Sequence, residues 1–107
     1  MRFIFLILLF TITSLSYGQD ITTVHFNYKW NVTNAYRGLD RLKNTKVQYA
    51  YVEDQSDVVK KSIKSVPTII IYKNGKPIHK FEAGLSMEIL VRFDSIQKTI
   101  NKHNEKK

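Results

Sequence analysis

The alternation of apolar and polar residues along the chain predicts four strands. Segments 21–28 and 46–52 are rich in β-branched and aromatic residues, and each alternates between two faces. Segment 68–72 is β-branched or aromatic without a break, which is typical of a strand buried on both faces. Asn74-Gly75 then predicts a hairpin turn, with 77–83 as the return strand.

Apolar residues at helical spacing predict three helices around these strands. Segment 30–44 has Asn31 as a candidate N-cap, segment 54–64 is a weaker helix, and the last helix follows a candidate cap at Ser86. The predicted order is therefore β-α-β-α-β-β-α. A helix between two neighbouring strands favours a parallel pair, and the hairpin adds antiparallel strands. We expect an α/β domain, a four-stranded mixed sheet with helices on both faces.

The first residues have the pattern of an export signal. Arg2 precedes the apolar run 3–12, and the small residues Ser16 and Gly18 precede a candidate cleavage point before Gln19. The apolar run is short for a membrane span, although an uncleaved N-terminal anchor remains the alternative. The sequence predicts a signal peptide at 1–18, a domain at 19–101 and a polar C-terminal tail at 102–107, in a periplasmic or secreted protein.

Composition adds two constraints. The 107 residues include no cysteine, so the chain has no thiolate to attack a substrate or bind a metal. The formal net charge of +8 favours an acidic partner surface, although a requirement for solubility explains it as well. The basic residues form no dense block and the chain has no zinc-finger spacing, so nucleic acid is not an expected partner.

One stretch carries a specific family resemblance. Val66-Pro67-Thr68, the strand that follows and the sequence Tyr-Lys-Asn-Gly at 72–75 resemble a segment of the thioredoxins. That segment reads Val/Ile-Pro-Thr, an apolar strand and Phe/Tyr-Lys-Asn/Asp-Gly. Gly-Leu-Ser at 84–86, Val-His-Phe at 24–26 and Trp30 are also similar to that family. The resemblance covers most of 21–101 and implies a minimal thioredoxin fold without the leading strand and helix of full-length members.

The resemblance fails at the redox centre. The family's Trp-Cys-x-x-Cys aligns with Trp30-Asn31-Val32-Thr33-Asn34, so asparagines stand at both cysteine positions. A cysteine there is a nucleophile because the helix N-terminus lowers the pKa of its thiol, whereas an asparagine amide only caps N–H groups. We therefore expect no catalytic residue, no cofactor and no thiol–disulfide oxidoreductase activity. A role in a thioredoxin-family redox system remains the alternative.

The resemblance also implies a site for non-covalent binding. In the family the proline is cis, and the backbone just before it hydrogen-bonds to an extended substrate peptide. The candidates for contact with a protein or extended peptide are Trp30, Val66, Pro67 and Gly84. The alternatives are a proline kept only for the shape of its loop and a basic face that binds acidic partners. A membrane is a partner only if the signal segment stays uncleaved.

The remaining chemistry is sparse. His25, His79 and His103 lack the spacing of metal ligands, and His25, which replaces a buried acid of the family, is expected to be structural. Asn31-Val32-Thr33 is an N-glycosylation sequon, but a helix cap explains the same asparagine. Three aromatic residues near the redox position either stack on a ligand or cover the end of the sheet: Tyr28, Trp30 and Tyr36.

Overall fold

The computed structural model describes residues 20–104. The expected signal peptide, 1–18, and the last three residues of the expected tail lie outside the described residues. Within them the strands are β1 (Ile21–Asn27), β2 (Lys46–Tyr51), β3 (Thr68–Lys73) and β4 (Lys76–Glu82), and the α-helices are α2 (Asp57–Ser62) and α3 (Phe93–Asn104). Three short 3-10 helices complete the order: Lys29–Asn34, Leu39–Arg41 and Val52–Asp54.

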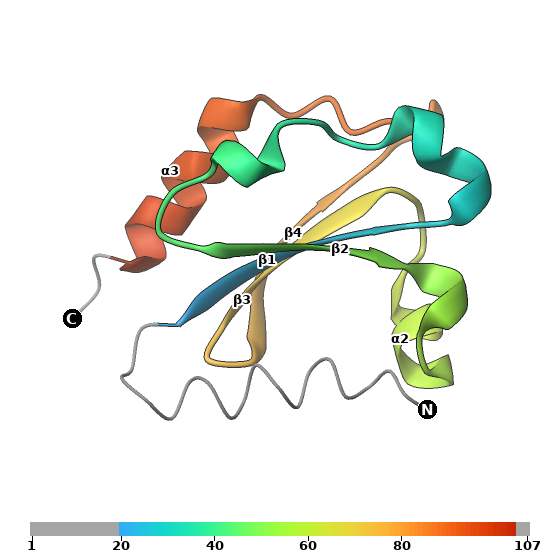
Figure 1. The fold of residues 1–107 in the computed structure, drawn as a ribbon, viewed down its shortest axis with the longest axis horizontal. Helices are drawn as coiled ribbons and strands as arrows, with labels where there is room; N and C mark the ends of the chain where they lie inside the picture. Colours follow the sequence, from blue (N-terminus) through green and yellow to red (C-terminus); the bar gives the residue numbers. More distant parts are fainter. Residues whose placement is uncertain (1–19, 105–107) are drawn as a thin grey trace.

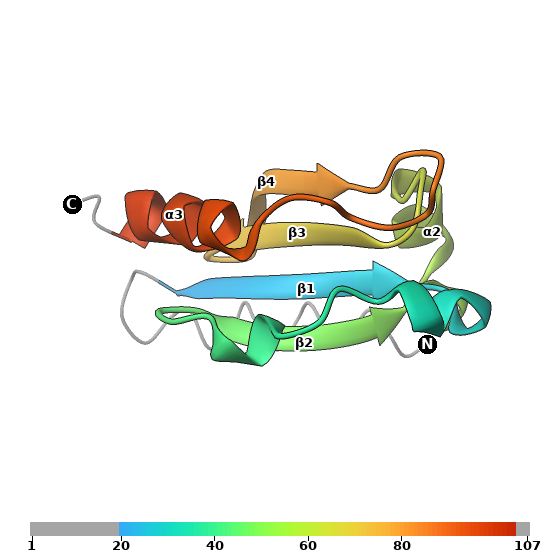
Figure 2. The ribbon, with the colours of Figure 1, turned by 90° about the horizontal axis from the view of Figure 1, so that it is seen from above.

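The four strands form one mixed sheet in the order β2-β1-β3-β4 (Figure 2). β1 pairs with β2 in parallel and with β3 antiparallel, and β3 pairs with β4 antiparallel. Asn74 and Gly75 turn the β3–β4 hairpin with φ of 53° and 84°, the positive angles that a two-residue turn of this kind requires. The predicted four-stranded mixed sheet is confirmed.

Apolar side chains from both faces of the sheet form two clusters. On one face, the side chains of β1 and β3 pack against α3 and the 3-10 helix Leu39–Arg41 (Figure 1). On the other face, side chains of β1 and β3 pack against α2, against Val52 before it, and against Ile63 and Val66 after it. The predicted cover on both faces is therefore present. Among residues 20–104, no helix is long and apolar enough to cross a membrane.

Segment 30–44 does not form the predicted α-helix. It forms two 3-10 helices separated by extended backbone at Ala35 and a left-handed Gly38, whose φ is 86°. The Tyr36 N–H donates to the imidazole Nε2 of His25 at 2.9 Å and not to a helical carbonyl. Two β-branched residues and two asparagines lower the helix propensity of the first half. This part of the prediction was wrong because local bonds and Gly38 interrupt the apolar spacing.

The other two helices begin later than predicted. α2 is capped by Ser56, whose Oγ accepts from the Val59 N–H, and it ends at Ser62. α3 begins at Phe93 and not after Ser86, because 84–92 is a loop in which Met87 has a positive φ of 61°. α3 continues through Asn104, so it includes the first three residues of the expected tail.

Candidate functional site

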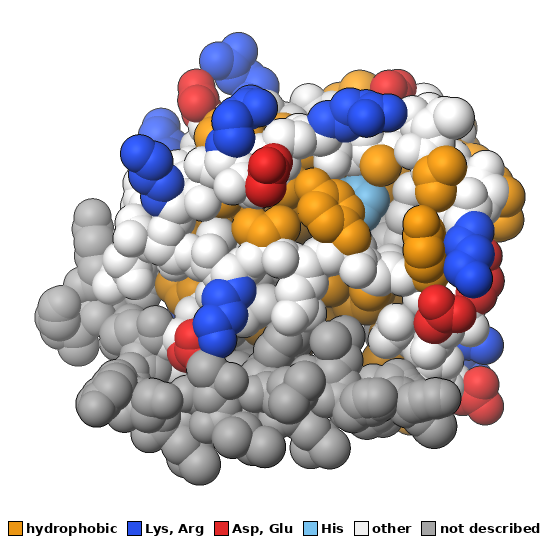
Figure 3. Space-filling view, viewed as in Figure 1, with side chains coloured by type: hydrophobic (Ala, Val, Ile, Leu, Met, Phe, Trp, Pro, Cys, Tyr) orange, Lys and Arg blue, Asp and Glu red, His pale blue; other side chains and the backbone are white. Residues whose placement is uncertain are grey.

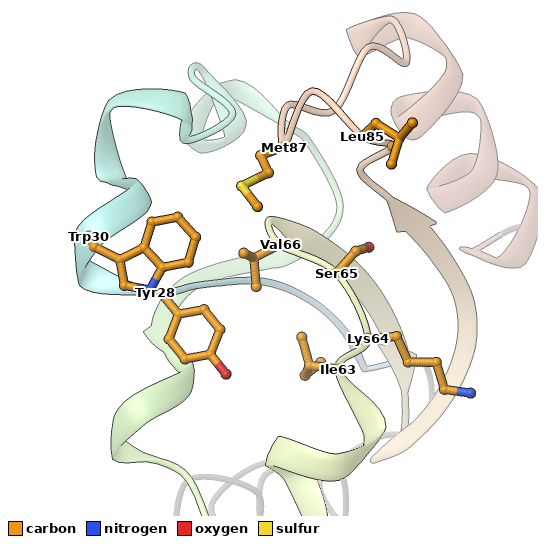
Figure 4. Close-up of a pocket in the computed structure, with 9 residues that line it drawn as sticks. Tyr28, Trp30, Ile63, Lys64, Ser65, Val66, Leu85 and Met87 are labelled. Carbon is orange, nitrogen blue, oxygen red and sulfur yellow. The ribbon is translucent and has the colours of Figure 1, made fainter.

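An apolar groove of about 340 Å³ lies at one end of the sheet (Figure 4). Tyr28 and Trp30 form one wall, and Met87 projects over the groove from the loop 84–92. Val66 and Ile63 form the floor. The full lining is Tyr28, Trp30, Ile63, Lys64, Ser65, Val66, Gly84, Leu85 and Met87. The chain thus brings together residues from three separate segments, and three of the four predicted contact residues, Trp30, Val66 and Gly84, are among them.

Trp30 is unusually exposed for a tryptophan. Its side chain is 63% exposed and stacks on Tyr28, with ring centroids 5.6 Å apart and planes at 14°. Tyr28 packs in turn against the cluster that contains Val66. Tyr36 does not join this pair, because its hydroxyl donates to the Val91 carbonyl at 2.8 Å and its ring packs against the α3 cluster. Of the three aromatic residues, two therefore shape the groove.

The Val66–Pro67 peptide bond is cis. Pro67 is fully buried and does not line the groove, so its side chain is not part of the groove surface. Its carbonyl accepts from the Ala83 N–H at 3.2 Å, which ties it to the end of β4. Within residues 20–104, the backbone N–H and C=O of Val66 form no hydrogen bond. The backbone just before the proline is therefore the free hydrogen-bonding edge of the groove.

Three asparagines form a connected amide network beside the groove. Asn31 is only 3% exposed, and its Nδ2 donates to Oδ1 of Asn27 at 3.1 Å and to the Met87 carbonyl at 3.3 Å. Its Oδ1 accepts from Nδ2 of Asn34 at 2.9 Å. Asn27 returns a bond from Nδ2 to the Asn31 carbonyl and accepts the Tyr28 N–H. The network joins β1, the first 3-10 helix and the loop that carries Met87.

This network corrects the predicted role of Asn31. The residue at the N-cap position of the 3-10 helix is Tyr28, and no side chain caps it. Asn31 lies inside the helix with φ −109° and ψ 18°, and its amide bonds to other segments. A glycan has no access to this amide in the folded chain, because the amide is buried and bonded. Asn31 fixes the position of Met87, and so of one side of the groove.

Sequence reasoning missed two partners of Asn31. Asn27 ends a strand of mostly β-branched and aromatic residues, where an asparagine is disfavoured, and that misfit was the available signal. Met87 contributes a backbone carbonyl, for which the sequence contains no signal. The remaining positions of the redox motif diverge in space: Thr33 is exposed, and Val32 lines a second hollow near β2.

His25 is buried in the middle of β1. Burial lowers the pKa of its imidazole to about 4, because a charged ring would lose its hydration there. Its Nε2 accepts the Tyr36 N–H, so the ring is neutral and holds the segment after the first 3-10 helix. Among the described residues, no group of three or more His, Cys, Asp or Glu side chains is placed to hold a metal ion. His25 has the structural role that the sequence predicted.

Comparison with known proteins identifies the fold. No protein-family model and no curated protein matches the chain. Among solved structures, a point mutant of a thioredoxin from Halobacterium salinarum NRC-1 superposes with a TM-score of 0.63 at 16% identity, over 92% of this chain and 85% of that chain. The reduced thioredoxin pre-protein of Schistosoma mansoni gives 0.61 at 17% identity, over 86% and 87%. A thioredoxin from Nicotiana alata gives 0.58 at 20% identity, over 92% and 84%.

These likenesses and the sheet order agree with the family resemblance in the sequence. The strand after the cis-proline, the hairpin and the tryptophan lie where the resemblance predicts, and no cysteine accompanies them. The chain is therefore a thioredoxin-like protein in fold, and it lacks the cysteines of the thioredoxin redox motif.

Proposed function

We propose that this chain is an exported protein that binds an extended segment of a partner polypeptide, without covalent chemistry, in the groove beside Trp30. One observation carries the proposal: the exposed Trp30 lies next to Val66, whose backbone N–H and C=O have no partner within residues 20–104. An extended peptide forms its strongest contacts with such an edge, because main-chain hydrogen bonds give affinity for any sequence.

The groove lining indicates what the peptide carries. Between Trp30 and Met87 the walls are apolar, so an apolar side chain of the peptide is the natural occupant. Lys64 is the one charged residue in the lining and lies at the rim, away from Trp30 (Figure 4). An acidic residue close to the apolar one would meet this ammonium group. We therefore expect a partner segment in which a Leu or Phe is flanked by Asp or Glu.

The absence of cysteine defines the type of complex. Thiol–disulfide exchange proceeds through a mixed disulfide, which requires a thiolate, and the sequence supplies none. At the two motif positions the side chains are amides that bond to each other. Association is thus reversible and independent of redox state. Reduction of insulin by dithiothreitol in the presence of the protein, above the rate without it, would contradict this part of the proposal.

The single tryptophan makes the groove directly observable. Trp30 is the one Trp of the chain, so its fluorescence reports on the groove alone. Titration with a synthetic peptide of the predicted type should shift the emission to the blue as the indole becomes buried. The same titration at high salt separates this mode from binding to a basic surface, because screening weakens exposed charge contacts much more than apolar and main-chain contacts.

Leu85 and Leu90 provide a matched pair of variants. Both are exposed leucines of the loop 84–92, but only Leu85 lines the groove. Loss of a Leu contact of about 1.5 kcal/mol weakens binding roughly tenfold, so Leu85→Ala should raise the Kd by that factor. Leu90→Ala should leave it unchanged. Equal effects of the two substitutions, or unchanged binding by Trp30→Ala in calorimetry, would show that the groove is not the binding site.

A further inference from the structure

The outer edge of β2 is open to pairing. β2 is the first strand of the sheet order, and within residues 20–104 it pairs only with β1. In a parallel pair, alternate residues point their N–H and C=O away from the neighbouring strand. Among the described residues, the carbonyls of Lys46 and Tyr51 at the two ends of β2 accept side-chain hydrogen bonds, from Thr45 and Gln55. The outward backbone groups between these ends are not paired by β1 and are a template for another strand.

The two edges of the sheet differ in their protection. β4, the other edge, carries Pro77 and the charged residues Lys76, Lys80 and Glu82, which are devices that discourage pairing. β2 contains no proline, and after Lys46 it has no charged residue. Its alternate residues Val47, Tyr49 and Tyr51 share one face of the sheet. Tyr49 is 54% exposed and Tyr51 41% exposed.

We infer that β2 is the interface of a homodimer, in which two copies pair their β2 strands antiparallel across a two-fold axis at Tyr49. With the axis perpendicular to the sheet, Tyr49 lies opposite its own counterpart and Val47 lies opposite Tyr51 of the second copy. Facing aromatic and β-branched side chains of this kind stabilise antiparallel pairs. A single surface then serves both copies, as an isologous interface requires.

Charge also favours a second copy as the occupant. The start of β2 is basic, with Lys43 and Lys46 exposed, and the residues just after its end are acidic. These acids, Glu53 and Asp54, stay exposed, although Lys29 of the same chain contacts both carboxylates. Antiparallel pairing of two copies places the basic end of each beside the acidic end of the other. A parallel arrangement would instead bring like charges together. The edge is therefore complementary to itself in one direction only.

A hollow beside this edge provides additional contact area. It has a volume of about 420 Å³ and lies between β2 and the first 3-10 helix, with the Tyr49 ring 5.1 Å from that of His25. Its lining is His25, Asn27, Val32, Ala35, Tyr49, Ala50 and Tyr51. Figure 3 shows hydrophobic side chains gathered above β2, with a histidine beside them. In the proposed register, the side chains of Tyr49 and Val47 from the second copy lie nearest this hollow and have an apolar surface to pack on here.

The lack of cysteine allows a clean cross-linking test of this register. In the full chain, Tyr49→Cys places two thiols across the axis, where facing Cα atoms of an antiparallel pair are about 4.5–5.5 Å apart, within reach of a disulfide. Lys46→Cys, on the same edge, and Val58→Cys, exposed elsewhere, are the controls. Under mild oxidation, Tyr49→Cys should form dimers roughly tenfold faster than either control, because pairing raises the effective thiol concentration.

Charge reversal keeps the inference testable if the aromatic pair is needed for folding. Sedimentation of the wild-type chain over a concentration series should show a monomer–dimer equilibrium. Lys46→Glu should shift it to monomer, and the combined Lys46→Glu and Asp54→Lys should restore the dimer. Lys76→Glu, in the β3–β4 hairpin, should leave it unchanged. A wild-type chain that stays monomeric, or equal cross-linking at positions 46, 49 and 58, would overturn the inference. Trp30→Ala should not affect the dimer, so this test is independent of the groove.

Discussion

The substitution Asn31→Ala tests whether the asparagine network is a structural element at the position that aligns with the thioredoxin redox motif. The Asn31 side chain forms three hydrogen bonds, to Asn27, Met87 and Asn34, and is 3% exposed. Alanine fits the same backbone but forms none of them. The substitution also removes the link between the first 3-10 helix and the loop 84–92, so it affects both stability and the shape of the groove.

The hydrogen bonds of Asn31 set the magnitude of the expected decrease in the free energy of unfolding. Each intramolecular hydrogen bond contributes about 1 kcal/mol net, which gives about 3 kcal/mol for three bonds as an upper value. Oδ1 of Asn27 keeps the Tyr28 N–H as a donor, and Asn34 is partly exposed, so water replaces part of what is lost. We expect a decrease of about 2 kcal/mol in the free energy of unfolding, which lowers the Tm by roughly 8–16 °C for a domain of this size.

Urea unfolding followed by the fluorescence of Trp30 measures this change, because Trp30 adjoins the network. The midpoint should fall while the m-value stays constant, since the folded and unfolded states expose the same surface as before. Asn34→Ala is the matched control: it removes a single bond at a partly exposed site, and we expect a loss of about 1 kcal/mol or less. Asn31→Ala should also weaken peptide binding, because Met87 is no longer held over the groove.

A loss below about 0.5 kcal/mol for Asn31→Ala, the range of an ordinary surface substitution, would refute this reasoning. It would mean that the amide bonds are exchanged for water at no net cost. Equal losses for Asn31→Ala and Asn34→Ala would show that burial of Asn31 has no energetic consequence. Either result would leave Asn31 without a structural role at the position that aligns with a cysteine of the thioredoxin motif.

Two further predictions concern stability. In the folded chain the pKa of His25 is lowered from 6.5 to about 4, so unfolding takes up a proton at any pH between these two values. The free energy of unfolding therefore has its full value above pH 6.5 and falls by about 3 kcal/mol as the pH decreases to 4. His25→Gln should flatten this part of a Tm-against-pH curve, and an unchanged slope would refute the assignment. Gly38→Ala should lower the free energy of unfolding by about 1 kcal/mol, because φ at this position is 86° and a Cβ would lie 3.0 Å from the Arg41 guanidinium. A Cβ at Gly84 would have no atom within 4 Å, so Gly84→Ala should leave thermal unfolding unchanged.

Residue pattern alone predicted the four strands and the mixed sheet. The β-branched run of β3, the Asn74-Gly75 turn and the alternating β1 and β2 indicate these strands, because period-two alternation and turn chemistry act locally. The order β2-β1-β3-β4 came from the tertiary structure. The missing cysteines are likewise a property of the sequence. Three of the four predicted groove residues followed from the resemblance, since the segment around Pro67 retains its spacing.

The helices were predicted less well, because short helices depend on contacts that sequence periodicity does not contain. The apolar spacing of 30–44 is genuine, and Leu39 and Leu42 are buried, yet Gly38 and the bond from Tyr36 to His25 divide the segment. The last helix begins later than predicted because two hydrogen bonds hold the loop before it. Asn31 donates to the Met87 carbonyl, and Tyr36 donates to the Val91 carbonyl.

Tertiary structure alone decided what the asparagines do. In the sequence, Asn31 has the features of a helix N-cap, a residue whose side chain bonds only to backbone groups of its own helix. In the fold, its amide lies within reach of Asn27, four residues earlier, and of Met87, fifty-six residues later. A buried amide takes the partners that surround it, because leaving it unbonded costs more than any local preference gains. The sequence determined that the redox centre was absent, and the packing determined what occupies its place.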